Sequence, residues 1–151
     1  LAKDSRVFDT GGFKSTKTDM TVDDLYAKFL EVFGVARTHC VNMYGMTELS
    51  SQIYDQNLLS YYTDGSSNYL KATPSWVRSV FLDPATLTPV ADGEQGVIAH
   101  YDLANWNSCL AILTEDLGVR TDSGYELNGR AKGAEARGCS IAVDEVMAAN
   151  A

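Results

Sequence analysis

The sequence predicts an α/β fold, in which a mixed sheet has flanking helices and a small antiparallel β-layer. Three observations support this prediction. The strongest helical pattern, residues 21–33, lies between two strand-like segments, 5–9 and 38–42. Both segments run into glycine turns, which lets the backbone pass close to a ligand. Two later strand-like segments, 76–83 and 96–101, flank a turn and predict an antiparallel pair.

The first strand-like segment ends in a pair of glycines, Gly11 and Gly12. Two glycines after a strand allow either close backbone approach to a flat ligand or an ordinary turn into a helix. The helix that follows has Thr21 as its cap and Asp24 three residues later, which is close to a capping box. Apolar residues recur at helical spacing up to residue 33, and Gly34 provides the stop.

The second strand-like segment leads into residues 42–48, Asn-Met-Tyr-Gly-Met-Thr-Glu. Gly45 removes a side chain that would block the backbone, Thr47 can donate a hydrogen bond to a phosphate oxygen, and Glu48 is a hard oxygen ligand suited to Mg²⁺. The strand–helix–strand arrangement predicts that Gly11, Gly12, Tyr44, Thr47 and Glu48 surround one crevice. The alternative is an ordinary helix start with Thr47 as its cap.

The rest of the chain is less sharply patterned. Residues 50–62 are polar and aromatic, and 63–68 predict a loop. Asp116 follows an apolar segment, and a carboxylate in a turn past a strand can accept two hydrogen bonds from a ribose; the alternative is an aspartate in an acidic loop. A short strand is expected at 124–127, then a basic segment with Arg130 and Lys132 that could equally be a surface turn, then a closing helix after residue 140.

The composition is typical of a soluble globular domain, with 151 residues of which 45% are hydrophobic and 21% charged. The net charge of −8 argues against a nucleic-acid partner, because a phosphate backbone attracts a basic surface. The apolar runs are too short to predict a membrane span. Three widely spaced cysteines and no zinc-type spacing favour free thiols in a reducing compartment, so we expect a cytoplasmic protein.

The motif at 42–48 resembles the central motif of the adenylate-forming superfamily, which includes acyl-CoA synthetases and peptide-synthetase adenylation domains. The resemblance implies that Tyr44 flanks the adenine of ATP, that Thr47 touches the α-phosphate and that Glu48 binds Mg²⁺. It also implies that the paired glycines line the adenine pocket. The fold expected is the C-terminal part of the large domain of these enzymes.

Later motifs occur in the order the superfamily shows. The segment 93–96 is similar to its Gly-Glu-x-Gly strand, and 114–118 is similar to its Thr-Gly-Asp-x-Gly motif, with Glu115 in place of the glycine. The resemblance implies that Asp116 binds the ribose hydroxyls and that Arg130, in a hinge-like segment, reaches the nucleotide. The superfamily's phosphate loop and the lysine of its small C-terminal domain have no counterpart here.

Two features resemble the LuxE-type acyl-protein synthetases: residues 10–14 and residues 135–140. That branch activates a fatty acid with ATP and transfers the acyl group to a protein thiol, which implies that Cys139 is the acceptor. Arg137 nearby would favour its thiolate, whereas the alternative is a small buried side chain. The implied partners are a fatty acid and an acyl-reductase or acyl-transferase protein.

The motifs divide the chain into a nucleotide-binding part at 1–72, a β-rich part at 73–128 and a hinge-like segment at 129–151. We expect the chain to be an incomplete portion of the enzyme that does not catalyse alone. Two other functions remain open from the sequence: an acyl- or aryl-CoA ligase of the phenylacetate-CoA ligase type, and a non-catalytic binding module.

Overall fold

The computed structural model of the protein describes residues 4–11 and 20–131. Its elements follow one another in this order: β1 (Val7–Thr10), α1 (Val22–Phe33), η1 (Arg37–His39), β2 (Cys40–Tyr44), β3 (Ile53–Asp55), α2 (Asn57–Asp64), β4 (Lys71–Ala72), β5 (Val77–Leu82), β6 (Gln95–Asp102), η2 (Leu103–Asn105), β7 (Ala111–Thr121) and β8 (Gly124–Arg130). The strands form one mixed sheet in the order β1-β2-β3-β4-β8-β7-β6-β5. The predicted α/β class is therefore confirmed.

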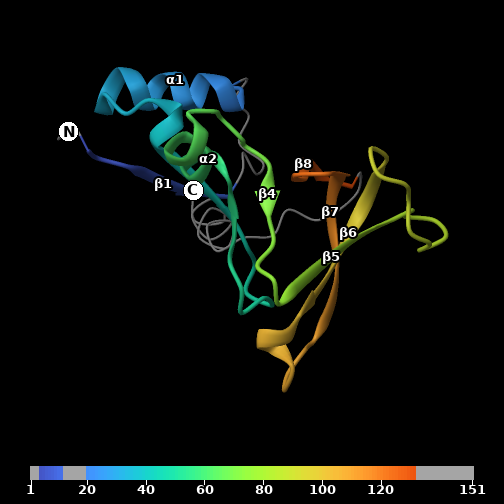
Figure 1. Cartoon of the computed structure of the whole chain (residues 1–151). Helices are drawn as coiled ribbons and strands as arrows, with labels where there is room; N and C mark the ends of the chain where they lie inside the picture. Colours follow the sequence, from blue (N-terminus) through green and yellow to red (C-terminus); the bar gives the residue numbers. More distant parts are fainter. Residues whose placement is uncertain (1–3, 12–19, 132–151) are drawn as a thin grey trace, which may run out of the picture.

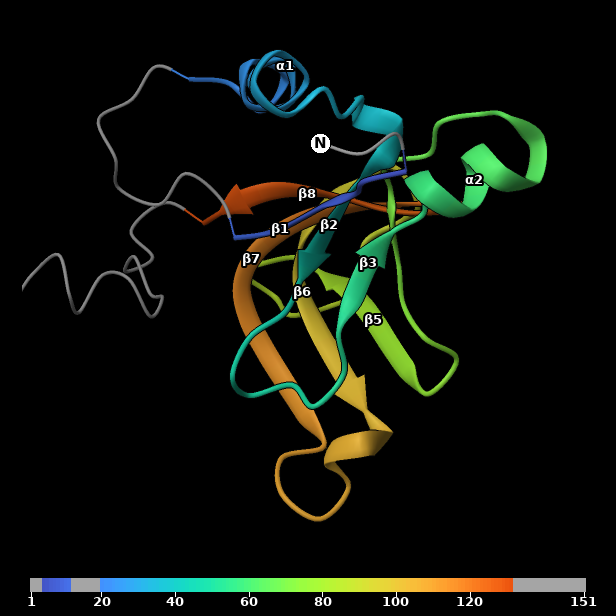
Figure 2. The same ribbon diagram turned by 90° about the vertical axis from the view of Figure 1, so that its left-hand side faces the viewer.

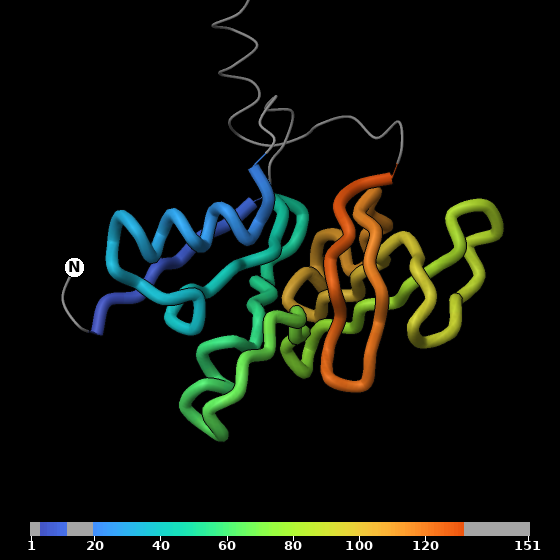
Figure 3. The backbone as a smooth tube through the Cα atoms, turned by 90° about the horizontal axis from the view of Figure 1, so that it is seen from above, coloured from blue at the N-terminus to red at the C-terminus, as the bar shows by residue number. Residues whose placement is uncertain are grey.

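The first half of the chain contains the helices and the parallel strands. Strands β1 and β2 pair in parallel, and α1 connects them (Figure 1). Thr21 caps α1 with a complete capping box to Asp24, and Gly34 ends it in the left-handed conformation, as the sequence predicts. Seen from above in Figure 3, this blue-to-green half lies beside the half that holds β5 to β8, which is coloured from yellow-green to orange-red.

Two predictions for this half are corrected: the start of the strand expected at 38–42, and the start of the loop expected at 63–68, since α2 extends to Asp64. The strand expected at 38–42 begins only at Cys40, because residues 37–39 form the short 3-10 helix η1. The buried Asn57 amide holds that turn, donating to the carbonyl oxygens of Arg37 (2.6 Å) and Cys40 (2.9 Å). The polar and aromatic segment after residue 50 forms β3 and α2, and Gly65 ends α2 in the left-handed conformation.

The second half is an antiparallel meander, β5-β6-β7-β8, and it confirms the expected pairing of the segments at 76–83 and 96–101. Strands β6 and β7 make the long hairpin that reaches the bottom of Figure 2. The turn expected around Asp116 is wrong, because Asp116 lies inside the eleven-residue strand β7. The registers on both sides of β7 shift next to it, which indicates bulges rather than a turn.

The core consists of two apolar clusters, one in each half. The larger one packs Ile53 and Tyr125 against residues of β5 and β6; its buried members are Ile53, Val77, Phe81, Ile98 and Tyr125. The smaller one packs Tyr26 of α1 against Val35 and Cys40. Lys71 of β4 pairs with Tyr125 of β8, which joins the two halves into a continuous sheet. None of the helices among the described residues is long and apolar enough to cross a membrane.

Candidate functional site

The carboxyl ends of the two parallel strands meet at one edge of the sheet. Thr10 is in register with Met43, and the Thr10 hydroxyl donates to the Met43 carbonyl oxygen at 3.2 Å. Gly11 and Tyr44, the next residues along the two strands, therefore lie at the same level of this edge. Gly11 has φ of 88°, a conformation that side chains rarely adopt, so a glycine is required at this position. Polar side chains at such an edge commonly form ligand sites in α/β proteins.

A buried polar network lies one pair of residues before this edge. Asp9 and Asn42 are register partners, and the Asn42 amide donates to Asp9 at 2.6 Å. The buried Lys71 ammonium donates to both the backbone and side-chain oxygens of Asn42, at 2.8 Å to the backbone. Burial lowers the pKa of Lys71, against the opposing attraction of Asp55 and Asp9. This network fixes the register of the strands that carry Gly11 and Tyr44.

Three of the predicted site residues come together although they lie far apart in the chain. The Tyr44 hydroxyl donates to the Asp116 carboxylate at 2.7 Å. Arg130 approaches the other oxygen of Asp116, with 3.6 Å between Nε and Oδ1, and also pairs with Glu115. Burial and the nearby Asp116 charge raise the pKa of Tyr44, so the phenol keeps its proton and remains a donor. The cluster presents one carboxylate, one phenol and one guanidinium.

His100 stands behind this cluster and was missed as a site residue. Its side chain is completely buried, with Nδ1 2.8 Å from the Ser79 hydroxyl and Nε2 3.4 Å from the Tyr44 hydroxyl. Burial lowers the pKa of His100 to about 4, despite the opposing charges of Asp116 and Asp102. The neutral imidazole therefore contacts the same Tyr44 hydroxyl that donates to Asp116. The sequence signal that could have revealed His100 is a histidine that follows the apolar residues Val97, Ile98 and Ala99 of a predicted strand.

Thr47 and Glu48 lie on a turn in the loop between β2 and β3, and both side chains are exposed. No helix begins there, so the alternative in which Thr47 is a helix cap is wrong. Among the described residues, none hydrogen-bonds to or pairs with the Thr47 hydroxyl or the Glu48 carboxylate. A lone exposed carboxylate suits Mg²⁺, which keeps several waters and binds through one or two carboxylates together with substrate phosphates.

Other predicted residues are placed only in part. Gly12 and Cys139 lie outside the described residues, so the structure says nothing of either. Gly45 lies directly after β2, and a side chain added there would come no closer than 3.8 Å to another group. Within residues 4–11 and 20–131, no three histidine, cysteine or acidic side chains are grouped so that they could hold a metal ion. Burial raises the pKa of the Cys40 thiol to about 11.

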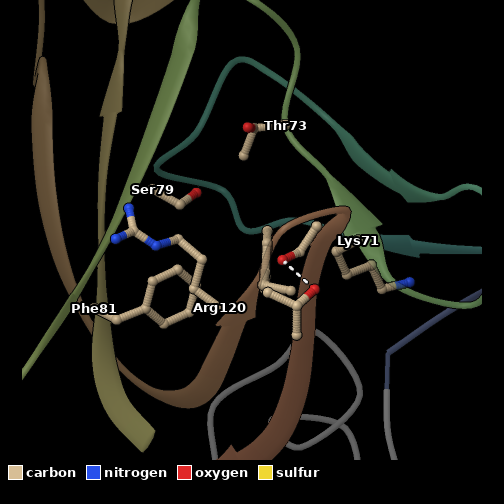
Figure 4. Close-up of a pocket in the computed structure, with 8 residues that line it drawn as sticks. Lys71, Thr73, Ser79, Phe81 and Arg120 are labelled. Carbon is tan, nitrogen blue, oxygen red and sulfur yellow. Dashed lines mark hydrogen bonds between the residues drawn. The ribbon is translucent and has the colours of Figure 1, made fainter. Parts of the chain in front are cut away.

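A small cavity of about 130 Å³ lies close to, but apart from, the predicted site residues (Figure 4). In Figure 4 the amino group of Lys71 points away from Arg120 and Phe81. Arg120 is itself paired with Asp92 at 2.5 Å. The cavity shares Ser79 with the surroundings of His100, but it contains none of the predicted nucleotide contacts. Its lining residues are Lys71, Thr73, Ser79, Phe81, Arg120, Thr121, Gly124 and Tyr125.

Comparison with protein families matches residues 1–148 to the family described as acyl-protein synthetase, LuxE. A long-chain-fatty-acid–luciferin-component ligase of Aliivibrio fischeri is 26% identical over 93% of this chain, and its counterpart in Vibrio harveyi is 27% identical over 55%. The chain spans 37% and 24% of the lengths of these two relatives.

Solved structures show the same fold in parts of larger enzymes. Apo MatB from Rhodopseudomonas palustris matches with a TM-score of 0.55 at 19% identity, over 84% of this chain and 26% of that one. The luciferase-like enzyme of the mealworm Zophobas morio matches with a TM-score of 0.51 at 19% identity, over 86% of this chain and 32% of that one. The expected fold, the C-terminal part of the large domain of adenylate-forming enzymes, is therefore confirmed.

Proposed function

The chain belongs to the LuxE acyl-protein synthetase family, and from that premise we propose that it supplies the nucleotide contacts of a ligase. The reaction would activate a long-chain fatty acid with ATP as an acyl-adenylate and then pass the acyl group to a protein cysteine. The observation that carries the proposal is the cluster of Tyr44, Asp116 and Arg130, which joins residues from three strands beside the edge where β1 and β2 end.

The cluster has the chemistry that an adenosine moiety requires. An ionised carboxylate offers about four lone pairs, so Asp116 can accept from Tyr44, lie beside Arg130 and still receive the two ribose hydroxyls. The Tyr44 ring provides a flat face for the adenine, next to the glycine backbone at Gly11. The buried His100 imidazole contacts the Tyr44 hydroxyl and helps to keep it in place.

The phosphates would lie toward the loop after β2, where Thr47 donates to the α-phosphate and Glu48 holds Mg²⁺. Mg²⁺, when bound, neutralises the phosphate charge that develops as the fatty carboxylate attacks the α-phosphorus. The bond to pyrophosphate breaks, and the mixed anhydride remains. The side chains of Thr47 and Glu48, which are exposed and have no hydrogen-bond or ion-pair partner among the described residues, support this assignment.

A thiolate then attacks the carbonyl carbon of the anhydride, forms the thioester and releases AMP. We assign Cys139 as this acceptor within the chain, and a cysteine of an acyl-reductase or acyl-transferase as the next one. Membership of the acyl-protein synthetase family supports a thiol acceptor. The substrate of the relatives, a long-chain fatty acid, supports the choice of acyl donor.

The first test is nucleotide binding by Asp116→Asn in the full-length protein, titrated with a fluorescent ATP analogue. Losing the charged acceptor should weaken binding about 10- to 100-fold, because hydrogen bonds to charged groups are worth about 1.5–3 kcal/mol. Asp122→Asn is the matched control, because Asp122 is an exposed aspartate in the turn between β7 and β8. Equal affinities in the wild type and both variants would refute the assignment of Asp116.

A further inference from the structure

The loop that carries Thr47 and Glu48 is held by side chains from a distant turn. Figures 1 and 2 show this loop, between β2 and β3, reaching the end of the sheet where η2 follows β6. Its own internal bond is a single turn contact, from the Leu49 amide to the Met46 carbonyl oxygen at 3.1 Å. Neither functional side chain is tied to the protein within the described residues. The position of the loop therefore depends on its backbone contacts.

Asp102, the last residue of β6, makes the first set of these contacts. Its carboxylate is completely buried and accepts from the Ser51 amide at 2.9 Å and the Ser51 hydroxyl at 2.8 Å. The same carboxylate accepts from the Ala104 amide at 2.9 Å, which fixes the η2 turn. Trp76 donates to the Ser51 hydroxyl at 2.9 Å and completes that group. A buried carboxylate with three donors is a strong anchor.

Asn105, the last residue of η2, makes the second set. Its side chain is only 4% exposed, and its amide nitrogen donates to the backbone carbonyl of Glu48 at 2.5 Å. Its amide oxygen accepts from the Ser50 hydroxyl. Two residues three apart in one turn thus bind the backbone of Glu48 and Ser51, which lie more than fifty positions earlier in the chain.

We propose that Asp102 and Asn105 are positioning residues that hold residues 46–51 in one conformation and thereby place Glu48 for Mg²⁺. The part of this inference that concerns Mg²⁺ rests on the proposed function. The part that concerns the loop does not, because it is a statement about the protein without ligands. The reaction gains from such preorganisation, since a metal ligand held in place needs no ordering when the nucleotide arrives.

Hydrogen exchange in the full-length protein without nucleotide tests the loop directly. Asp102→Asn and Asn105→Ala should each speed exchange of the amides in 48–51 by about tenfold or more, because each removes a buried bond to that backbone. Asn57→Ala is the matched control, since Asn57 is equally buried and also donates to backbone carbonyls, but of η1 and β2. Asn57→Ala should leave the amide exchange rates of residues 48–51 unchanged.

Unchanged exchange at 48–51 in Asp102→Asn and Asn105→Ala would overturn the proposal, as would equal acceleration by Asn57→Ala. If Asp102→Asn does not fold, Ser51→Ala takes its place. That variant keeps the bond from the Ser51 amide to Asp102 but removes the hydroxyl that joins Asp102 and Trp76, and it should accelerate exchange in the same segment.

The metal-dependent part is tested by Mg²⁺ titrations of ATP-analogue binding. Asn105→Ala should raise the half-saturating Mg²⁺ concentration about threefold or more in the wild-type background and leave it unchanged in a Glu48→Gln background, because coupled residues are not additive. An equal rise in both backgrounds would overturn the positioning role toward Glu48. If Glu48→Gln alone leaves the Mg²⁺ dependence unchanged while exchange at 48–51 still responds, the loop anchor is supported and the metal assignment under the proposed function fails.

Discussion

Replacing His100 with glutamine tests the buried support of the site through the pH dependence of stability. Burial lowers the pKa of His100 from 6.5 to about 4, so between these values the unfolded chain binds a proton that the folded protein does not. The folded protein keeps its full stability above the unfolded-state pKa of 6.5 and loses stability as the pH falls from that value toward about 4. The full loss is about 3 kcal/mol, of which about 2 kcal/mol is lost by about pH 5.

The other shifted carboxyl groups do not cause this fall in stability. The pKa values of Asp24, Asp64 and Asp83 are lowered, so these groups change the free energy of unfolding only as the pH falls below their ordinary pKa of 3.8. Burial raises the pKa of Asp55, which acts with the opposite sign because the folded protein then binds the extra proton. The fall in stability as the pH drops toward about 5 is therefore assigned to His100.

Urea unfolding at a series of pH values between about 7.5 and 5 measures the difference between wild type and His100→Gln. The wild type should lose stability over this range, and the variant should show a flatter profile. His39→Gln is the control, since it removes the other histidine of the chain, which lies partly exposed against Tyr61. Parallel profiles for wild type and His100→Gln would refute the reasoning.

Three further substitutions separate packing from ligand binding. Gly118→Ala should lower the free energy of unfolding by about 2 kcal/mol in urea denaturation, because its Cβ would lie 2.7 Å from the Glu126 carbonyl oxygen; wild-type stability would contradict the bulge geometry. Gly45→Ala has room and should keep wild-type stability while weakening binding of an ATP analogue; unchanged affinity would remove Gly45 from the site. Tyr44→Phe loses the 2.7 Å bond to Asp116 and should weaken the same binding about fivefold, whereas full affinity would show the phenol to be dispensable.

The sequence was informative wherever local rules decide the structure. The capping box at Thr21, the glycine stop after α1 and the glycine after β1 each depend on residues within a few positions of one another. The antiparallel pairing of β5 and β6 also followed from short apolar segments that flank a turn. The polar segment after residue 50 did not reveal β3 and α2, because tertiary contacts such as those of Asn57 outweigh its weak local pattern.

The site could be predicted only as separate motifs. Tyr44 and Asp116 lie 72 positions apart, and their contact depends on the sheet order that places β8 and β7 beyond β4. The bulges that place Asp116 inside β7 have no clear local signature. His100 was missed because β6 is buried on both faces at residues 96–100, so no alternation distinguishes a functional side chain from a packed one. Asp102 and Asn105 were missed because their partners, Ser51 and Glu48, lie more than fifty positions earlier in the chain.

Intact mass spectrometry of the full-length protein, after incubation with ATP, Mg²⁺ and a long-chain fatty acid, tests the central claim most directly. The proposed function predicts a hydroxylamine-sensitive acyl increment that maps to Cys139 and disappears in Cys139→Ser, while that variant still releases pyrophosphate. Asp116→Asn should lose both signals. Pyrophosphate release without any increment would move the acceptor to coenzyme A or another protein. The absence of both the acyl increment and pyrophosphate release would contradict the proposed ligase.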